Sequence, residues 1–263
     1  RTAFGIDGYV RIVAAAAAAG ITEVKLTGGE PLLYRDGSAG IVELVQALSE
    51  LREQNYFALS MTTNGVLLPR YSRALKTAGL DRVTISLHTL DEKTFRDLIA
   101  GTGRVRPNAV VKGIEEAVAA DLTPVKVNSL LFRSVDGKQH AGELENIVKL
   151  CRRIGVSQLR LYTLLRHDDF ADHERLYVYW DRPLLERLGI AVYGKGEAAE
   201  QYAAAAVSFV EEWRSRVYPK PTFVARNGTF EVAIEAMESG RFDELELPDE
   251  GPYALRLSAD GLL

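Results

Sequence analysis

The sequence has little of several features that would place it in a special class of proteins. Cys151 is the only cysteine among 263 residues, which excludes an internal disulfide and suits a cytoplasmic setting. No apolar run approaches the roughly 20 residues that span a bilayer, and no signal peptide is recognisable at the start. Neither sign of charge dominates, and the formal net charge of −4 argues against a general nucleic-acid binder. What remains is an ordinary globular composition, 47% hydrophobic and 26% charged.

The first 165 residues alternate between helical and strand patterns. Helices are predicted over 6–19, 41–54, 71–78, from 91, over 108–120 and over 142–154, and strands over 24–27, 57–62, 82–87, 124–132 and 158–165. Short, nearly continuous apolar strands between helices indicate an α/β fold with parallel strands and helices packed outside. The sequence opens on a helix, so we expect one preceding strand to be missing.

The pattern changes after residue 166, and we predict two domains, a barrel over 1–166 and a C-terminal extension over 167–263. The extension is expected to close one end of the barrel and to complete the substrate pocket. It begins with HDDFADH, which is either a metal cluster of His167, Asp168, Asp169 and His173 or, as we favour, a solvated loop. A long alanine-rich helix is predicted over 197–217, a hairpin over 222–234 with its turn at Asn227-Gly228, and a strand over 253–257.

Polar residues gather where the predicted strands end. The stretch KLTGGEPLLYRD (25–36) places two glycines and a proline after a strand, at a cost in stability that indicates a place where the backbone must approach another group closely. The other strand ends carry Thr63-Asn64-Gly65, Ser86 with His88, Asn128 with Ser129, and Arg160 with Tyr162. Any one of these is a common turn residue. Because the carboxyl ends of parallel strands meet at one face, the five together predict a ligand site.

KLTGGEPLL, TTNGVLL, AGLDRVTISLHTLDEKTF and PVKVNSLL, in this order and spacing, resemble the radical S-adenosylmethionine (SAM) superfamily. The resemblance is closest to the GTP 3′,8-cyclase family of molybdenum cofactor biosynthesis; it covers 1–165 and resumes at YALRLSADGLL. It implies a partial (β/α)6 barrel in which the GGEP backbone holds the methionyl amino group of SAM. It also implies that Ser86 meets the ribose and that Arg160 pairs with the carboxylate through parallel hydrogen bonds. The cofactor-binding residues implied are Gly28, Gly29, Glu30, Pro31, Thr63, Asn64, Ser86 and Arg160.

Two departures from the family concern its iron–sulfur clusters. The family holds one [4Fe–4S] cluster through a C-x-x-x-C-x-x-C loop before the first helix, and this sequence has no such loop. We expect the loop to have been cut off or not represented, and one cluster in the intact protein; no residue of this chain is predicted to bind metal. Cys151 is predicted to be a buried small hydrophobe. The cyclase has a second cluster, but Asp249 and Pro252 stand at the matching positions, so that cluster is not expected.

A further departure concerns the substrate. Lys25, Lys126 and Arg256 keep the basic character of residues that hold the triphosphate in the cyclase, whereas Glu23 and Ala254 replace two others. Fewer cations favour a smaller anion such as a monophosphate. Lys25 could instead be a strand lysine reaching solvent, and Arg256 an exposed edge residue. Asn128 and His88 complete the predicted substrate-binding set, although His88, where the cyclase carries aspartate, could instead be a packed histidine.

The resemblance implies an enzyme of the lyase class that cleaves SAM to a 5′-deoxyadenosyl radical and cyclises a nucleotide through a carbon–carbon bond. The first hypothesis is an enolpyruvyl uridine monophosphate cyclase like the octosyl acid phosphate synthases of antibiotic biosynthesis. The alternatives are a GTP 3′,8-cyclase and a cluster-free barrel that acts as a binding or partner subunit. The implied partners are a small nucleotide and an electron donor such as flavodoxin or ferredoxin, with no nucleic-acid polymer and no membrane. A homodimer is left open.

Overall fold

The computed structural model describes residues 4–100, 105–131, 141–163, 208–212, 222–227, 230–235 and 254–257. These residues belong to two compact units, each of which is described by itself. Unit 1 contains the described residues up to Ser86, those from Val110 to Val125, and 254–257. Unit 2 contains those from Leu87 to Ala109 and from Lys126 to 235.

Unit 1 is built on four parallel strands in the order β11-β1-β4-β5. The strands are β1 (Glu23–Leu26), β4 (Ala58–Thr63), β5 (Arg82–Ser86) and β11 (Ala254–Leu257). One face of the strands is fully buried and carries Val24, Met61 and Ile85. The residues next to them in the sequence, Lys25, Thr62 and Thr84, are partly accessible. The strands therefore have an apolar face and a more polar one.

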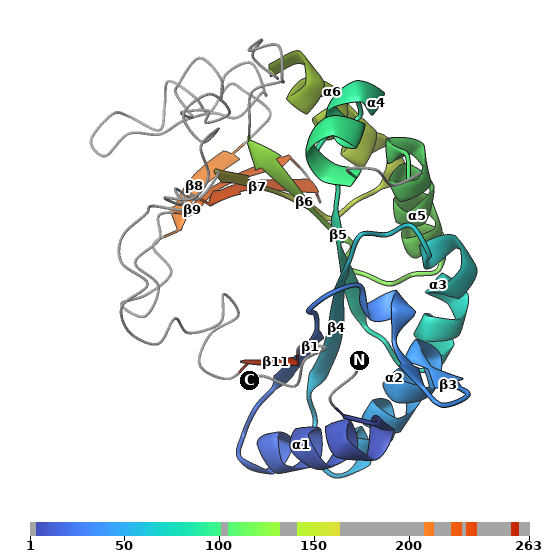
Figure 1. The fold of residues 1–263 in the computed structure, drawn as a ribbon. Helices are drawn as coiled ribbons and strands as arrows, with labels where there is room; N and C mark the ends of the chain where they lie inside the picture. Colours follow the sequence, from blue (N-terminus) through green and yellow to red (C-terminus); the bar gives the residue numbers. More distant parts are fainter. Residues whose placement is uncertain are drawn as a thin grey trace, which may run out of the picture. The chain divides into compact units, whose positions relative to one another are not determined.

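Helices α1 (Ile6–Ala18), α2 (Ile41–Glu50) and α3 (Leu68–Thr77) lie on one side of these strands (Figure 1). Short elements connect them, namely η1 (Pro31–Leu33), the β2–β3 hairpin (Arg35–Asp36 and Ala39–Gly40) and η2 (Leu51–Glu53). Helix α2 buries Ile41, Leu44, Val45 and Leu48, the apolar stripe that its sequence predicts. Each such buried side chain contributes roughly 1.5–3 kcal/mol to the stability of the core.

Unit 2 combines parallel and antiparallel pairing. Strands β6 (Lys126–Leu131), β7 (Gln158–Thr163) and β10 (Phe230–Glu235) run parallel, and β10 continues antiparallel to β9 (Thr222–Asn227) and then β8 (Ser208–Glu212). Its helical segments are α4 (Glu92–Thr94), the π-helical η3 (Phe95–Ala100) and α6 (Ala141–Ile154). Helix α5 (Pro107–Ala119) begins in unit 2 and continues into unit 1.

The predicted α/β class is confirmed, because β1, β4, β5, β6 and β7 occur where the five strands were expected and alternate with helices. The hairpin prediction is also confirmed, with Asn227 opposite Phe230. The helix predicted over 197–217 is wrong in its described part, where Ser208–Glu212 form β8. Pairing with β9 overrides the helical propensity of the surrounding alanines, since strand formation depends on the neighbouring strand more than on local preference.

Two segments of the predicted C-terminal extension add parallel strands to earlier ones. In unit 1, β11 pairs with β1, and in unit 2, β10 pairs with β7. The domain boundary at 166 and the pocket-completing role of the extension stay predictions. No helix in the described part of the chain is long and apolar enough to cross a membrane.

Candidate functional site

The carboxyl ends of β1, β4 and β5 surround a pocket of about 280 Å³ in unit 1. Its lining residues are Thr27, Gly28, Gly29, Glu30, Thr62, Thr63, Asn64 and Ser86. The structure thus brings together six of the residues predicted to bind SAM. Thr27 and Thr62 were missed, although each directly precedes a predicted site residue in the sequence. The volume of this pocket is just below the usual range for small-molecule sites, about 300–1,000 Å³.

The two glycines of the pocket have different roles. Gly28 has a φ of 111°, a left-handed conformation that side chains rarely adopt, so glycine is needed there for the turn itself. Gly29 has no such constraint, and a Cβ built on it would meet no heavy atom within 4 Å. Gly29 lines the pocket, and no protein atom lies where its side chain would stand, so its backbone is accessible to a ligand.

Glu30 ties the glycine loop to the end of β4. Its carboxylate accepts hydrogen bonds from the Thr63 hydroxyl at 2.6 Å, from the Asn64 N–H at 2.8 Å and from the Leu32 N–H at 3.1 Å. Charge-assisted bonds of this kind are stronger than neutral ones. Glu30 is therefore a positioning residue for both loops of the pocket. Pro31 begins η1 and is not among the lining residues.

The second loop, Thr63 to Val66, is a turn held by its own side chains. The Thr63 hydroxyl oxygen accepts from the Gly65 N–H at 3.1 Å, and Asn64 Oδ1 accepts from the Val66 N–H at 3.0 Å. Gly65 has a φ of 78°, and a Cβ there would lie 2.7 Å from Ile85 Cγ2. The turn thus needs glycine at this position for conformation and for packing.

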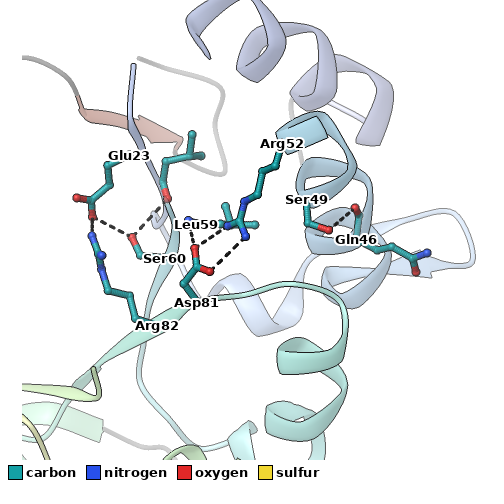
Figure 2. A network of polar contacts seen from close by, with 9 residues as sticks. Glu23, Gln46, Ser49, Arg52, Leu59, Ser60, Asp81 and Arg82 are labelled. Carbon is teal, nitrogen blue, oxygen red and sulfur yellow. Dashed lines mark hydrogen bonds and ion pairs between the residues drawn. The ribbon is translucent and has the colours of Figure 1, made fainter. Parts of the chain in front are cut away.

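One register position across the four strands of unit 1 includes two of the predicted phosphate ligands. Parallel register places Arg256 beside Lys25, Lys25 beside Ser60, and Ser60 beside Arg82. Arg82 forms an ion pair with Glu23, whose Oε1 also accepts from the Ser60 hydroxyl at 3.4 Å (Figure 2). Sequence reasoning missed Arg82, because pairing across strands depends on register, which the sequence does not show directly.

A second network in Figure 2 is structural. The Asp81 carboxylate accepts two hydrogen bonds from Arg52, at 3.2 and 2.6 Å, and one from the Leu59 N–H at 2.6 Å. Arg52 also lies over the Phe57 ring, 5.4 Å from its centroid. These contacts join η2 and the start of β5 to β4 and involve no residue of the pocket.

Four other predicted site residues lie in unit 2. Lys126 and Asn128 are on β6, opposite Gln158 and Arg160 of β7. The Arg160 Nε–H donates to Gln158 Oε1 at 2.7 Å. Asn128 Oδ1 is buried and has no hydrogen-bond partner among the described residues, which leaves an acceptor for a ligand donor.

His88, the fourth of them, accepts a hydrogen bond at Nδ1 from the Leu130 N–H at 3.2 Å. Burial lowers the pKa of His88 to about 4, so the imidazole is neutral at pH 7. Since Nδ1 is the acceptor, the ring proton lies on Nε2. His88 thus satisfies a backbone N–H of β6, as the packing interpretation predicts, and it brings no positive charge to an anionic substrate.

Among the described residues, no group of three or more histidine, cysteine or acidic side chains is placed to hold a metal ion. The HDDFADH run at 167–173 lies outside the described residues. Cys151 is fully buried, and burial raises the pKa of its thiol to about 12. A [4Fe–4S] cluster is held by thiolates, so a single buried thiol does not fit one. The open backbone at Gly29 does fit the amino-acid end of SAM.

Comparison with known proteins gives a consistent result. The Radical SAM superfamily description matches residues 6–151. A probable GTP 3′,8-cyclase of Sulfurisphaera tokodaii is 41% identical over 161 residues, which cover 60% of this chain and 47% of that protein. One of Thermoplasma volcanium is 31% identical over 232 residues, 88% of this chain and 62% of that protein. The chain thus spans about half the length of the curated relatives it matches.

Among solved structures, Streptococcus suis SuiB is similar with a TM-score of 0.52 and 21% sequence identity, over 72% of this chain and 39% of that chain. At this identity the likeness concerns the fold, and it agrees with the partial-barrel fold class predicted from the sequence. Superfamily members use SAM and a [4Fe–4S] cluster. Because the family match covers more than half of the chain and includes the glycine loop of the pocket, the chain belongs to the radical SAM superfamily.

Proposed function

We propose that this protein is a radical SAM enzyme that binds SAM in the pocket at the ends of β1, β4 and β5 and cyclises a nucleotide. The observation that carries the proposal is the open space beside the Gly29 backbone, within a pocket that Glu30 holds in shape. SAM, when bound, supplies the radical chemistry of the superfamily. The chain's own residues position the ligands and keep solvent from the reacting groups.

Each predicted residue has a stated part in this proposal. The backbone of Gly28 and Gly29 meets the methionyl amino group, the Ser86 hydroxyl meets the ribose, and Arg160 pairs with the carboxylate. Thr63 and Asn64 line the same pocket as the glycine loop. Glu30 holds the glycine loop against the end of β4, and Pro31 begins η1 after that loop. The substrate would contact the predicted substrate-binding residues, which are Lys25, Lys126, Asn128, His88 and Arg256.

The relatives bear on which nucleotide is cyclised. Both curated relatives reported above are named as probable GTP 3′,8-cyclases, so a guanosine nucleotide is the better-supported substrate. Neither name refers to an enolpyruvyl uridine nucleotide, to a lyase or to antibiotic biosynthesis. The enolpyruvyl uridine monophosphate cyclase is therefore kept as the alternative that the nucleotide-binding experiment distinguishes. An electron donor and a homodimer remain parts of the proposal.

The SAM site is tested by calorimetry with Gly29→Ala. The added methyl group meets no protein atom, so the fold should be kept while the methyl occupies the pocket and lowers SAM affinity at least about tenfold. Leu33→Ala is the control, because Leu33 follows the same loop but is 65% exposed and does not line the pocket. Unchanged SAM affinity in Gly29→Ala would contradict the assignment of this pocket.

The nucleotide is tested in the same assay with SAM present. Guanosine and uridine nucleotides of equal phosphate number are compared, so that only the base differs. Tighter binding of the guanosine compounds is expected. Tighter binding of the uridine compounds would favour the enolpyruvyl uridine alternative, and SAM binding with no nucleotide binding would favour a binding or partner subunit.

A further inference from the structure

One carboxylate oxygen in unit 2 holds the connection between β5 and α4. It is Oε1 of Glu143, which lies in the first turn of α6. It accepts hydrogen bonds from three successive residues, namely from the Thr89 hydroxyl, from the Leu90 N–H at 2.6 Å and from the Asp91 N–H at 2.9 Å. Successive donors that converge on one anion form a nest, and here the anion is a side chain more than 50 positions away in the sequence.

The β5–α4 connection depends on this oxygen. Thr89 is fully buried, and among the described residues Glu143 is the one acceptor for its hydroxyl and for the Leu90 N–H. A buried donor that loses its acceptor is costly, so the connection would have to rearrange to reach water. The Asp91 carboxylate in turn accepts from the Thr94 N–H at 2.7 Å at the start of α4. Helices α4 and α6 accordingly lie side by side (Figure 1).

The connection begins directly after Ser86, the residue of β5 that lines the pocket. Ser86 belongs to unit 1 and Leu87 to unit 2, and the peptide chain itself joins them. Three residues span at most about 10 Å, so the place where Thr89 is held limits where the chain leaves Ser86. Strand β6 also holds Leu87 and the His88 ring, by one hydrogen bond each. Beyond them, Glu143 is the anchor of the connection.

We propose that Glu143 is a positioning residue for SAM, which keeps the Ser86 hydroxyl where it meets the ribose by holding the β5–α4 connection. The inference rests on the proposed function, in which the glycine loop meets the methionyl end of SAM and Ser86 meets the ribose. Glu143 does not line the pocket and acts through the connection. Its effect therefore falls on the nucleoside half of SAM. The glycine loop is held by Glu30 within unit 1 and keeps its hold on the amino-acid half.

Competition calorimetry with the two halves of SAM tests this. Methylthioadenosine carries the adenine and the ribose, and methionine carries the amino-acid group. Glu143→Ala should weaken methylthioadenosine about tenfold, as expected for the loss of one hydrogen bond to the ribose, and methionine less than about twofold. Glu143→Gln should restore most of the affinity, since its amide oxygen can accept from the same donors. Glu92→Ala is the matched control, because it removes an exposed glutamate beside the same connection.

Thr89→Val is a second, milder variant, since valine has the shape of threonine and removes one of the three donors. It should weaken methylthioadenosine less than Glu143→Ala does, and the double variant should bind no more weakly than Glu143→Ala alone. Circular dichroism checks that each variant is folded, and Thr89→Val decides alone if Glu143→Ala is not.

Three results would overturn the role of Glu143 while SAM binding by wild type leaves the proposed function intact. They are equal losses on the two halves, no rescue by Glu143→Gln, and unchanged methylthioadenosine affinity in Thr89→Val. If wild type binds neither SAM nor its halves, the proposed function fails and this inference fails with it.

Discussion

Some residues at the strand ends can be recognised as site residues from the sequence alone, whereas the contacts between them cannot. Gly28, Gly29 and Glu30 could be predicted because glycine and proline after a strand lower stability unless the site requires them. The contacts of Glu30 with Thr63 and Asn64 and the contact of Glu23 with Arg82 could not, because each bond joins residues more than 30 positions apart. Such contacts depend on strand register, and a shift of one residue would turn each side chain to the other face.

The burial of the single residue His88 predicts how the free energy of unfolding depends on pH. Its pKa is lowered by burial from 6.5 to about 4, so between these values the unfolded chain binds a proton that the folded protein does not. The contribution of His88 to stability is therefore complete above about pH 6.5 and is lost as the pH falls toward 4, at up to about 1.4 kcal/mol per pH unit.

His88→Asn removes the titrating group and keeps an acceptor within range of the Leu130 N–H. Urea unfolding from pH 7 to pH 4.5 should show a shallower loss of stability in the variant than in wild type. At pH 7 the variant is expected to be the less stable of the two, because the smaller side chain fills the site less well. Parallel pH curves would show that His88 does not titrate as its burial implies.

At the scale of elements, periodicity alone predicted the five parallel strands and most helices to within a few residues. Helix α3 begins at Leu68, earlier than predicted, because Pro69 is compatible with the first turn of a helix. Strand β8 was missed for a different reason. Its sequence, Ser-Phe-Val-Glu-Glu, lacks the alternation typical of a strand and lies beside alanine-rich sequence, and only pairing with β9 favours the strand.

Helix α5 and the turn after β4 approach so closely that a packing prediction follows. A Cβ on Gly113 of α5 would overlap the backbone oxygen of Gly65, which accepts a hydrogen bond from Leu68 N–H at the start of α3. Gly113→Ala gains about 1 kcal/mol of helix propensity but forces this turn to move. We expect a net loss of about 1–2 kcal/mol in the free energy of unfolding.

The same substitution should weaken SAM binding, because Thr63 and Asn64 of the displaced turn line the pocket. Lys112→Ala is the control, since Lys112 is the exposed neighbour of Gly113 in α5 and should leave both quantities nearly unchanged. Denaturant unfolding and SAM calorimetry measure the two effects. A Gly113→Ala protein as stable as wild type would mean that the helix and the turn separate at little cost.

At the scale of the whole molecule, binding of SAM by the pocket and binding of an iron–sulfur cluster require different residues. All eight residues that line the pocket lie in unit 1, and the hydrogen bonds that join Glu30 to Thr63 and Asn64 are made within it. The superfamily's cluster, in contrast, needs several thiolates, and the 263 residues of this chain contain one cysteine. SAM recognition by the pocket and the holding of a cluster should therefore be separable in this chain.

The separation can be measured on the purified chain after anaerobic treatment with iron and sulfide. We expect iron well below one [4Fe–4S] cluster per chain, because burial keeps the Cys151 thiol protonated, with its pKa raised to about 12. SAM binding should still be detectable by calorimetry in the untreated chain and should be lost in Gly29→Ala, since the pocket residues need no iron to take their positions. Cys151→Ser serves as the control for adventitious iron. A full complement of iron that Cys151→Ser abolishes would show that the helix opens to expose this thiol, and SAM binding that appears only with iron would show that the pocket alone does not recognise SAM.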